Sequence, residues 1–415
     1  MAENYKFAEC AASENDGELT GREGQLYKRG TDPRSEFDRD YTRILHCQAY
    51  RRLKHKTQVF FNEAGNDHIC TRIEHVAHVE SVAGTIAQVL GLNQDLTRAI
   101  ALGHDIGHAP FGHRGEVIID ELVKTYITGN PLEAKRDFWH EQNGVYIADN
   151  LELLENPDGK YQNMQLTYAV RNGIISHCGE IDENGIKPEA RRINLDEFDT
   201  VGKFQACTWE GCVVKVSDKI AYLGRDIQDA MTLGFLSDND MRELSLKIYN
   251  KPDLRINTTT IIQEMIGDIC RCSSPEKGLC LSDEKANQLK KIKDFNYEKI
   301  YFSRRHNPFN RYARLMLSEL FEALKLLYKG EETISYIDSI NFDNKPFIKV
   351  FGEFLAKYCN PVETWPDWAK GIASNTANKK IYGFLTDEKV YYRAIIDFLA
   401  GMTDAYAMKA FEQLL

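Results

Sequence analysis

Apolar residues recur at spacings of three and four along much of this chain, and that period constrains the fold more strongly than any other sequence feature. Between Ile73 and Leu90, valine, alanine and isoleucine keep the spacing until Gly91, and glycine commonly ends a helix. The same pattern predicts helices over residues 96–102, 145–154, 166–176, 213–231 and 311–328, and one unbroken helix over 390–415. Strand-like alternation is rare, with at most a small hairpin expected near 179–193. The sequence therefore predicts an all-α fold.

The composition excludes several classes of protein. Hydrophobic residues make up 43% and charged residues 27% of the 415 residues, which favours a folded globular chain over a disordered one. The formal net charge of −10 argues against a uniformly basic nucleic-acid coat. No apolar run approaches the roughly 20 residues of a membrane helix, and the polar, acidic start is unlike a secretory signal. We therefore expect a cytoplasmic protein with reduced cysteines.

The histidines divide the chain into two regions. Ten of the eleven lie between His46 and His177, and only His306 follows them. We place a boundary near residue 240, with a catalytic region and its N-terminal arm over 1–240. The helical region over 241–415 carries no obvious chemistry, and we expect it to serve as a scaffold, in oligomerisation and in regulation.

Two histidines and two aspartates predict a metal site. His75 belongs to the first long helix, His104 and Asp105 adjoin at a helix end, and Asp218 belongs to a later helix. Adjacent residues do not share a helix face, but at a helix terminus both side chains can turn toward one ion. Two imidazoles and two carboxylates make a mixed nitrogen and oxygen site that suits Mn²⁺, Fe²⁺, Mg²⁺ or Zn²⁺, with positions left open for water and substrate.

Each of these residues alone has a simpler explanation, since a single helix histidine is usually a packed core residue. The stronger argument is their combination with the glycine-rich sequence HDIGHAPFGH and a later aspartate in an apolar helix. We interpret the remaining histidines as structural or supporting ones: His46, His55, His68, His78 and His177. Cys270, Cys272 and Cys280 lack a clear fourth ligand, and we expect free thiols there.

The segments RSEFDRDYTRILHCQAYRRLKHKTQVF, NDHICTRIEHVAHVES, HDIGHAPFGH, WHEQ, SDKIAYLGRD and DFLAGMTDAYA carry a family resemblance. The chain resembles the HD-domain deoxynucleoside triphosphate triphosphohydrolases, the bacterial dGTPase family, from Arg34 to Asp229 and again from Asp397 to Ala407. It departs from the family pattern at Val76, where relatives often carry a small hydroxyl residue. The resemblance implies an all-α HD-domain phosphohydrolase fold with a helical C-terminal extension.

The resemblance also implies an activity and a set of roles. The expected reaction is metal-dependent attack of water on the α-phosphorus of a dNTP, with dGTP as one candidate, releasing deoxynucleoside and intact triphosphate. A histidine would protonate the leaving oxygen, and we favour His113 over His140. Glu116 would orient His113, Glu141 would lie beside His140, and His108 could bind a phosphate.

The resemblance assigns the remaining contacts to the substrate. Two cations would bind the triphosphate: Arg72 and Lys219. Gln58 and Asp226 would hydrogen-bond the 3′-hydroxyl, while Tyr222 and Val59 would pack against the sugar and exclude a 2′-hydroxyl. A basic run beside these residues could assist or could be a solvated face: Arg51, Arg52, Lys54 and Lys56.

Two alternatives stay open at this stage. One is another HD phosphohydrolase, a nucleotidase or an alarmone hydrolase, which would release different phosphate products. The other is a nucleotide-sensing or nucleic-acid-binding module whose catalytic site has decayed. The presence of every expected ligand residue argues against such decay. The resemblance further implies a homo-oligomer, a tetramer or hexamer, and a nucleotide or single-stranded DNA effector, with no membrane partner.

Overall fold

The helix predicted to begin near Ile73 is α4 (Arg72–Leu90). At its start, the Glu74 carboxylate accepts a 2.7 Å hydrogen bond from the backbone nitrogen of Thr71, which caps one of the unsatisfied first-turn donors. At its end, Gly91 adopts a left-handed conformation with φ of 81°, which glycine enters without steric cost. The expected helix and its stop at Gly91 are both confirmed.

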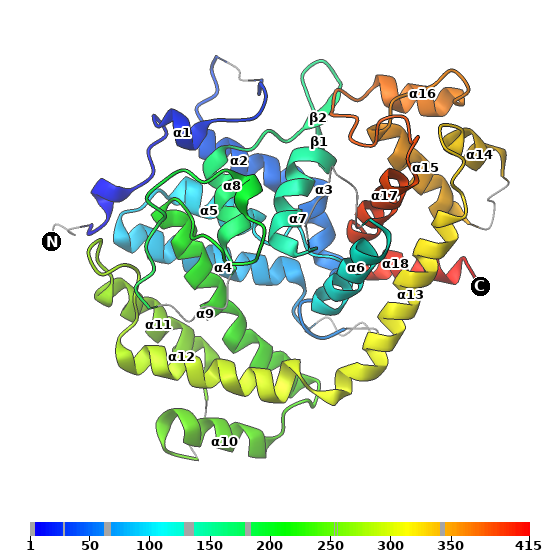
Figure 1. Ribbon diagram of the computed structural model, residues 1–415. Coiled ribbons are helices and arrows are strands. Elements are labelled where there is room, and N and C mark those ends of the chain that lie inside the picture. Colours follow the sequence, from blue (N-terminus) through cyan, green and yellow to red (C-terminus); the bar gives the residue numbers. More distant parts are fainter. Residues whose placement is uncertain are drawn as a thin grey trace.

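The computed structural model describes residues 5–27, 30–61, 68–127, 137–178, 184–252, 254, 256–340 and 345–415. Figure 1 shows a molecule built almost entirely of helices. In the first half these are α1 (Gly17–Thr20), α2 (Glu36–His46), α3 (Gln48–Arg52), α4, α5 (Gln94–Gly103), α6 (Gly112–Tyr126), α7 (His140–Tyr146), α8 (Tyr168–Ser176) and α9 (Trp209–Thr232).

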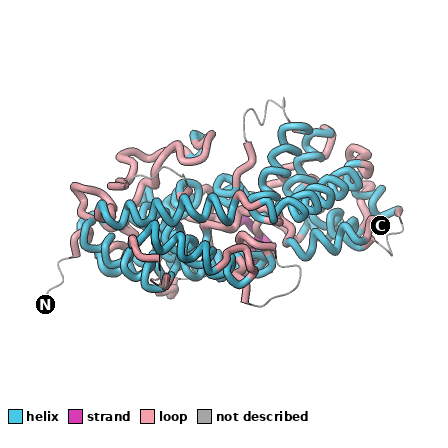
Figure 2. Tube along the Cα trace, turned by 90° about the horizontal axis from the view of Figure 1, so that it is seen from below, coloured by secondary structure: helices cyan, strands magenta, loops and turns pink. Residues whose placement is uncertain are grey.

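The second half continues with α10 (Asp238–Tyr249), α11 (Thr258–Cys272), α12 (Asp283–Asn296), α13 (Asn307–Lys325), α14 (Thr333–Ser339), α15 (Pro346–Tyr358), α16 (Asp367–Ser374), α17 (Glu388–Ala400) and α18 (Asp404–Glu412). Short 3₁₀ turns are η1 (Ala8–Cys10), η2 (Leu53–His55), η4 (Leu195–Glu197) and η6 (Arg304–His306), and the π turns are η3 (Ile147–Leu151) and η5 (Tyr297–Tyr301). Figure 2 shows how small the strand content is beside these helices.

Helix α4 lies at the centre of the first half. It packs against α5 and α9, while α2 and α8 also pack on α5, so that α4, the end of α5 and α9 face one another. The second half closes the molecule on another side, where α13 and α17 both pack on α6 (Figure 1). The predicted all-α fold is confirmed.

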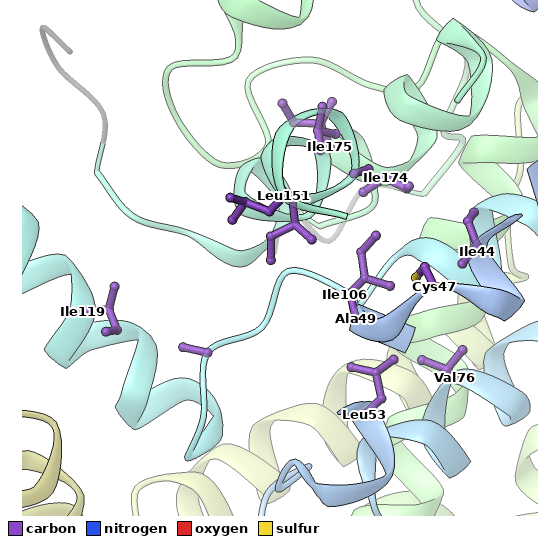
Figure 3. Close-up of a cluster of buried hydrophobic side chains, with 14 of the residues drawn as sticks. Ile44, Cys47, Ala49, Leu53, Val76, Ile106, Ile119, Leu151, Ile174 and Ile175 are labelled. Carbon is purple, nitrogen blue, oxygen red and sulfur yellow. The ribbon is translucent and has the colours of Figure 1, made fainter. Parts of the chain in front are cut away.

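The turn that follows α5 is fixed in the core by Ile106, which is 1% exposed. Figure 3 shows this side chain among others from α2, the junction between α2 and α3, η3 and α8: Ile44, Cys47, Leu151 and Ile174. Burial of an isoleucine side chain is worth about 2–3 kcal/mol, so the neighbouring His104 and Asp105 are held on a rigid turn.

The strand prediction is wrong in its position. The described hairpin joins β1 (Leu153–Glu155) to β2 (Tyr161–Asn163) as antiparallel strands. Its turn contains Gly159 at a φ of 76°, a conformation that glycine adopts readily. The helix expected over 145–154 therefore stops at η3, before β1. Within the segment expected as a hairpin, 179–193, residues 179–183 lie outside the described residues, and the remainder forms only an isolated bridge between Ile186 and Leu279.

The single helix expected over 390–415 is also wrong. Helix α17 ends at Ala400, and a new helix, α18, starts after Thr403, whose hydroxyl accepts a 3.1 Å hydrogen bond from the nitrogen of Tyr406. A threonine side chain at this position caps the new helix start, which offsets the cost of the break. Within the described residues, no helix is both long enough and apolar enough to cross a lipid bilayer.

Candidate functional site

The four predicted metal ligands come together from three helices. His75 lies in the first turn of α4, His104 and Asp105 follow directly on α5, and Asp218 lies on α9. His75 Nε2 is 2.9 Å from Asp218 Oδ1 and 3.9 Å from Asp105 Oδ2, and His104 Nε2 is 3.5 Å from Asp105 Oδ1 and 3.9 Å from Asp218 Oδ1. Three of the side chains are buried and that of Asp218 is 14% exposed. We call these four residues the His75 cluster.

The donor atoms of the His75 cluster suit a divalent cation. His104 Nδ1 lies 2.7 Å from the carbonyl oxygen of Ala101, which can only accept, so the ring proton is on Nδ1 and Nε2 presents a lone pair. That Nε2 is buried and has no hydrogen-bond partner among the described residues. A buried polar atom without a partner is costly, and an ion would satisfy it. Two imidazoles and two carboxylates are a donor set that Mn²⁺, Fe²⁺, Mg²⁺ and Zn²⁺ accept.

Electrostatics keep the carboxylates of the cluster ionised. Although burial opposes a charged Asp105, the adjacent His104 and the Arg72 guanidinium, 2.7 Å away, hold the pKa of Asp105 well below its usual range. Burial likewise opposes a charged Asp218, but the hydrogen bond from His75 lowers the pKa of Asp218 to about 2. The same hydrogen bond raises the pKa of His75 against the effect of its burial. Both carboxylates are therefore available as anionic ligands at neutral pH.

A second pair of histidines lies next to this cluster. His108 Nε2 is 3.1 Å from Asp105 Oδ1, and its ring stacks on that of His140. Burial and the nearby Arg72 hold the pKa of His108 well below its usual range. Burial also opposes a charged His140, yet Glu141 and Glu116 raise the pKa of His140 to about 9. His140 is therefore protonated at neutral pH and His108 is neutral.

Glu116, on α6, connects both candidate acids. Its Oε1 accepts a 2.7 Å hydrogen bond from the backbone nitrogen of His140 and lies 3.2 Å from Nδ1 of the same residue. Its Oε2 lies 3.2 Å from Nδ1 of His113, whose side chain is 90% exposed. Glu141 Oε2 is 3.4 Å from His140 Nδ1. The expected pairing of Glu116 with His113 is present, while the contact of Glu116 with His140 was not foreseen.

One face of α9 carries three of the predicted site residues. Asp218, Tyr222 and Asp226 are one turn apart, and Lys219 adjoins Asp218. Asp226 is 2% exposed and accepts a hydrogen bond from the hydroxyl of Tyr301. Burial raises the pKa of Asp226 to about 7, although the Tyr301 hydroxyl favours the ionised form.

Tyr301, at the end of η5, contacts the candidate site through Asp226, and the sequence did not reveal it. It lies 75 residues from Asp226 in the sequence. No spacing pattern connects it with α9, and its tyrosine-rich surroundings read as ordinary helix packing. Only the way in which α12 and η5 pack on α9 brings the two side chains together.

Gln58 and Val59 lie in the segment before α4. The carbonyl oxygen of Gln58 accepts a 3.2 Å hydrogen bond from Arg72, which places this segment beside the His75 cluster. The side-chain Oε1 of Gln58 is buried and has no hydrogen-bond partner in the described part of the chain. Val59 is half-buried and packs against the hydrophobic core. Their contacts with a sugar stay predictions, as do the roles of the other site residues.

Two glycines, Gly107 within HDIGHAPFGH and Gly115 two residues after it, are explained by close approaches of the backbone. A Cβ on Gly107 would lie 1.9 Å from the carbonyl oxygen of His140, and one on Gly115 would lie 1.7 Å from that of Pro110. Phe111, between them, adopts a φ of 64°, which is unusual for a residue with a side chain. The absence of side chains at the two glycines therefore lets α7 and α6 approach the turn that carries His104 and Asp105.

The four residues of the predicted basic run differ in burial: some lie at the surface and one lies in the core. Arg51 and Lys54 are exposed, and Arg52 pairs with Glu152 at 2.8 Å. Lys56 is 2% exposed, and its Nζ donates hydrogen bonds to the carbonyl oxygens of His108 and Ala400, the second at 3.2 Å. Burial lowers the pKa of Lys56 to about 7. The run is therefore not one phosphate-binding surface. Its most buried member, Lys56, connects the end of α17 to the turn after α5 that carries His104, Asp105 and His108, which we call the HD turn.

The cysteines carry no disulfide. Cys280 donates a 3.2 Å hydrogen bond to the carbonyl oxygen of Cys272, and the Cys272 thiol lies 3.9 Å from Asp268. Neither they nor Cys270 belong to the metal-ligating groups within the described residues. None of the three forms a disulfide, and their role as free thiols rather than metal ligands stays a prediction.

An open cavity of about 720 Å³ lies apart from this chemistry, between the β1–β2 hairpin and helices α15 to α18. Its walls include Arg52, Tyr161, Phe354, Lys357 and Tyr406, and none of the candidate site residues lines it. The His75 cluster is therefore recognised by its donor atoms rather than by this cavity.

Comparison with known proteins agrees with this geometry. The HD domain family model matches residues 72–223, which include all four members of the His75 cluster. A deoxyguanosinetriphosphate triphosphohydrolase-like protein of Caldanaerobacter subterraneus subsp. tengcongensis is 31% identical over 92% of this chain and 86% of its own. Proteins of the same name from Rickettsia felis and Desulfatibacillum aliphaticivorans are 30% and 35% identical over 94% and 70% of this chain and 94% and 73% of their own. The chain therefore belongs to the deoxyguanosinetriphosphate triphosphohydrolase-like family of HD-domain phosphohydrolases.

Proposed function

We propose that this protein is a metal-dependent triphosphohydrolase that converts a dNTP, with dGTP as a candidate, into deoxynucleoside and inorganic triphosphate. The observation that carries the proposal is the convergence of His75, His104, Asp105 and Asp218 beside the Arg72 guanidinium and a histidine pair with opposite pKa shifts. Relatives named deoxyguanosinetriphosphate triphosphohydrolase-like proteins support the choice of substrate class.

In this proposal the His75 cluster holds the divalent ion, which is Mn²⁺, Mg²⁺, Fe²⁺ or Zn²⁺. When bound, such an ion polarises a phosphoryl oxygen and activates a water molecule as the nucleophile. The buried, unpartnered Nε2 of His104 and the two ionised carboxylates support the assignment. Arg72, through its 2.7 Å contact with Asp105, orients that carboxylate toward the other donors.

The substrate's triphosphate carries about four negative charges and needs cationic partners. Arg72 and Lys219 supply them from the first turn of α4 and from α9. His140 adds a third positive charge at neutral pH, because its pKa is about 9. His108 would bind a phosphate oxygen by giving up its 3.1 Å contact with Asp105, because a neutral imidazole has a single N–H to donate.

The departing 5′-oxygen of the deoxynucleoside must receive a proton as the bond to the α-phosphorus breaks. His113 and His140 are the candidate donors, and we favour His113, whose exposed ring can reach a bound substrate. The Glu116 carboxylate accepts a hydrogen bond from Nδ1 of each histidine, so it holds each ring in a fixed orientation. Glu141 stabilises the charged form of His140.

Sugar recognition would distinguish deoxyribose from ribose. The unpartnered Oε1 of Gln58 and the carboxylate of Asp226 are acceptors for the 3′-hydroxyl. Tyr222 and Val59 would cover the 2′ position and leave no space for a hydroxyl. We extend the proposal to a cytoplasmic homo-oligomer, a tetramer or hexamer, controlled by a nucleotide or single-stranded DNA, as the family resemblance implies.

The test is an assay of the purified protein with each of the four dNTPs and with GTP, singly and mixed, in Mn²⁺ or Mg²⁺, with all products separated by chromatography. Deoxynucleoside together with intact triphosphate is the expected result. Orthophosphate or pyrophosphate would identify a nucleotidase or an alarmone hydrolase instead. Absence of turnover in every mixture, with nucleotide binding retained, would identify a sensing module.

A further inference from the structure

A second group of metal-ligating side chains includes one member of the histidine pair, His140. It consists of His140 and Glu141, at the start of α7, and His177 and Cys178, just after α8. One ligand atom from each of the four lies within 4.8 Å of those of the others. Cys178 Sγ is 3.8 Å from His140 Nε2. We call these four residues the Cys178 cluster.

Two buried atoms of the Cys178 cluster make no hydrogen bond within the described ranges: His177 Nε2, and Glu141 Oε2, which lies 3.4 Å from His140 Nδ1. His177 is 1% and Glu141 is 2% exposed, so water does not readily satisfy either atom. His177 Nδ1 lies 2.7 Å from the carbonyl oxygen of Ile174, which places the proton on Nδ1 and a lone pair on Nε2. A buried nitrogen lone pair that meets no hydrogen-bond donor would be satisfied by a cation.

His140 directs its second ring nitrogen to the same point, and an ion bound there would displace the proton that this nitrogen carries when His140 is charged. Its Nδ1 faces Glu116 at 3.2 Å, which leaves Nε2 directed toward the thiol of Cys178. The four donors are then two imidazole nitrogens, one carboxylate oxygen and one sulfur, a set that zinc prefers over Mg²⁺ or Mn²⁺.

We propose that the Cys178 cluster is a second metal site, which binds Zn²⁺ or a similarly soft divalent ion. Ligand atoms around tetrahedral zinc are about 3.3–3.8 Å apart, so the cluster has to contract by only about 1 Å to close on the ion. With Glu141 ionised and Cys178 as thiolate, the bound site has no net charge, which suits its burial.

The Cys178 cluster is separate from the His75 cluster. The two share no ligand, and the rings of His104 and His177 meet edge to face with centroids 5.0 Å apart. The His75 cluster has two carboxylates and no sulfur, whereas the Cys178 cluster has the thiol, so the two favour different ions. The chain can therefore hold a hard ion in one cluster and a soft ion in the other.

Occupation of the Cys178 cluster would inhibit hydrolysis, and this consequence, unlike the binding itself, rests on the proposed function. An ion on His140 Nε2 takes away the lone pair or proton that this residue would use toward the phosphate. Excess Zn²⁺ should therefore inhibit an enzyme that Mn²⁺ activates, and exchange of Cys178 for serine should relieve the inhibition.

Cobalt(II) tests the binding without any substrate, since Co²⁺ replaces Zn²⁺ and a thiolate ligand gives a near-ultraviolet charge-transfer band. The metal-free protein is titrated with CoCl₂ as wild type and as four variants: Cys178→Ser, Cys178→Asp, Cys207→Ser and His75→Ala. Cys207 is a half-buried thiol outside the cluster and serves as the matched control. Zinc content after dialysis is measured in parallel by mass spectrometry.

We expect the band in wild type, in Cys207→Ser and in His75→Ala, and its loss in both Cys178 variants. Cys178→Asp, which keeps an anionic ligand, should retain zinc with an affinity about 10–100-fold weaker, and Cys178→Ser should bind one zinc ion fewer per chain. A wild type without the band, a band that persists in Cys178→Ser, or a band that disappears in His75→Ala would each overturn the proposal. Failure of the proposed hydrolase activity would leave these spectra unchanged, so the two proposals fail separately.

Discussion

The imidazole rings of His108 and His140 stack with their centroids 3.7 Å apart and their planes 16° from parallel. Two positive charges at this separation would repel strongly, so the pair holds one proton beyond neutrality. Glu116 and Glu141 lie on the side of His140, and the Arg72 guanidinium acts on His108. The positive charge therefore rests on His140, next to the two carboxylates that stabilise it.

This arrangement predicts a pH dependence of stability. A pKa raised from 6.5 to about 9 means that protonated His140 stabilises the folded state. That contribution is complete below pH 6.5, the ordinary pKa, and is lost as the pH rises through about 9. Glu116→Gln removes a charge that raises this pKa, so urea unfolding should show a smaller decline in the free energy of unfolding over this window than in wild type.

Glu121→Gln is the control for that experiment. Glu121 lies on the same helix, α6, and pairs with Arg314 rather than with a histidine. Its own pKa is lowered, so it does not titrate in the alkaline window. Equal declines in wild type and Glu116→Gln would show that Glu116 does not set the protonation of His140.

Removal of a proposed metal ligand should abolish turnover. His104→Ala or Asp105→Ala takes one donor from the His75 cluster, and the loss of activity should exceed the 10–100-fold typical of residues that only support a ligand. Metal content by mass spectrometry and dNTP hydrolysis are both measured. His78→Ala, an exposed histidine three residues from His75 on α4, should match wild type. Wild-type turnover by either ligand variant, with metal supplied, would refute the assignment.

Tyr301→Phe should weaken substrate binding without changing the chemistry. The variant loses the hydrogen bond to Asp226, worth about 1 kcal/mol, so KM for the dNTP should rise about fivefold with little change in kcat. The rise should be largest below pH 7, because the Tyr301 hydroxyl favours ionised Asp226, whose pKa is about 7. Tyr297→Phe, on the same π turn, should leave KM unchanged. An unaltered KM in Tyr301→Phe would exclude the proposed positioning role.

Asp404 should be a strong determinant of stability. Its buried carboxylate accepts hydrogen bonds from the backbone nitrogens of Thr57, at 2.9 Å, and Phe111, at 2.8 Å. Asp404→Ala leaves both donors without this partner and should lower the free energy of unfolding by about 3 kcal/mol in urea. Asp387→Ala removes only a cap at the start of α17 and should cost about 1 kcal/mol. Equal losses in the two variants would contradict the argument.

Periodicity alone was enough to predict the helices that build the His75 cluster, because α4 and α9 have long apolar faces that end at recognisable stops. The break in the last helix could also have been foreseen. Gly401 followed by Thr403 is a helix stop followed by an N-cap, but the apolar pattern continues across both residues. The hairpin was missed because the leucines of β1 extend the helical pattern of the preceding segment.

The site was predictable where its residues adjoin in motifs and unpredictable where tertiary packing alone joins them. His104 and Asp105 stand together in the sequence, whereas Tyr301 reaches Asp226 from a separate helical region. The burial of Lys56 was equally hidden, since a lysine among other basic residues usually faces water. Sequence patterns report the local period and spacing of residues. The contacts of Tyr301 and Lys56 depend instead on how distant helices pack, which no local pattern records.

The contacts of Lys56 and Asp404 also bear on how the protein is made. The carbonyl of Ala400 lies 344 residues beyond Lys56, and Asp404 lies 293 residues beyond Phe111. While the chain emerges from the ribosome, the HD turn is therefore complete in sequence long before its backbone donors and the Lys56 ammonium can find these partners. The contacts of Lys56 and of the Thr57 and Phe111 backbone donors are therefore completed only after the chain has been translated as far as Asp404.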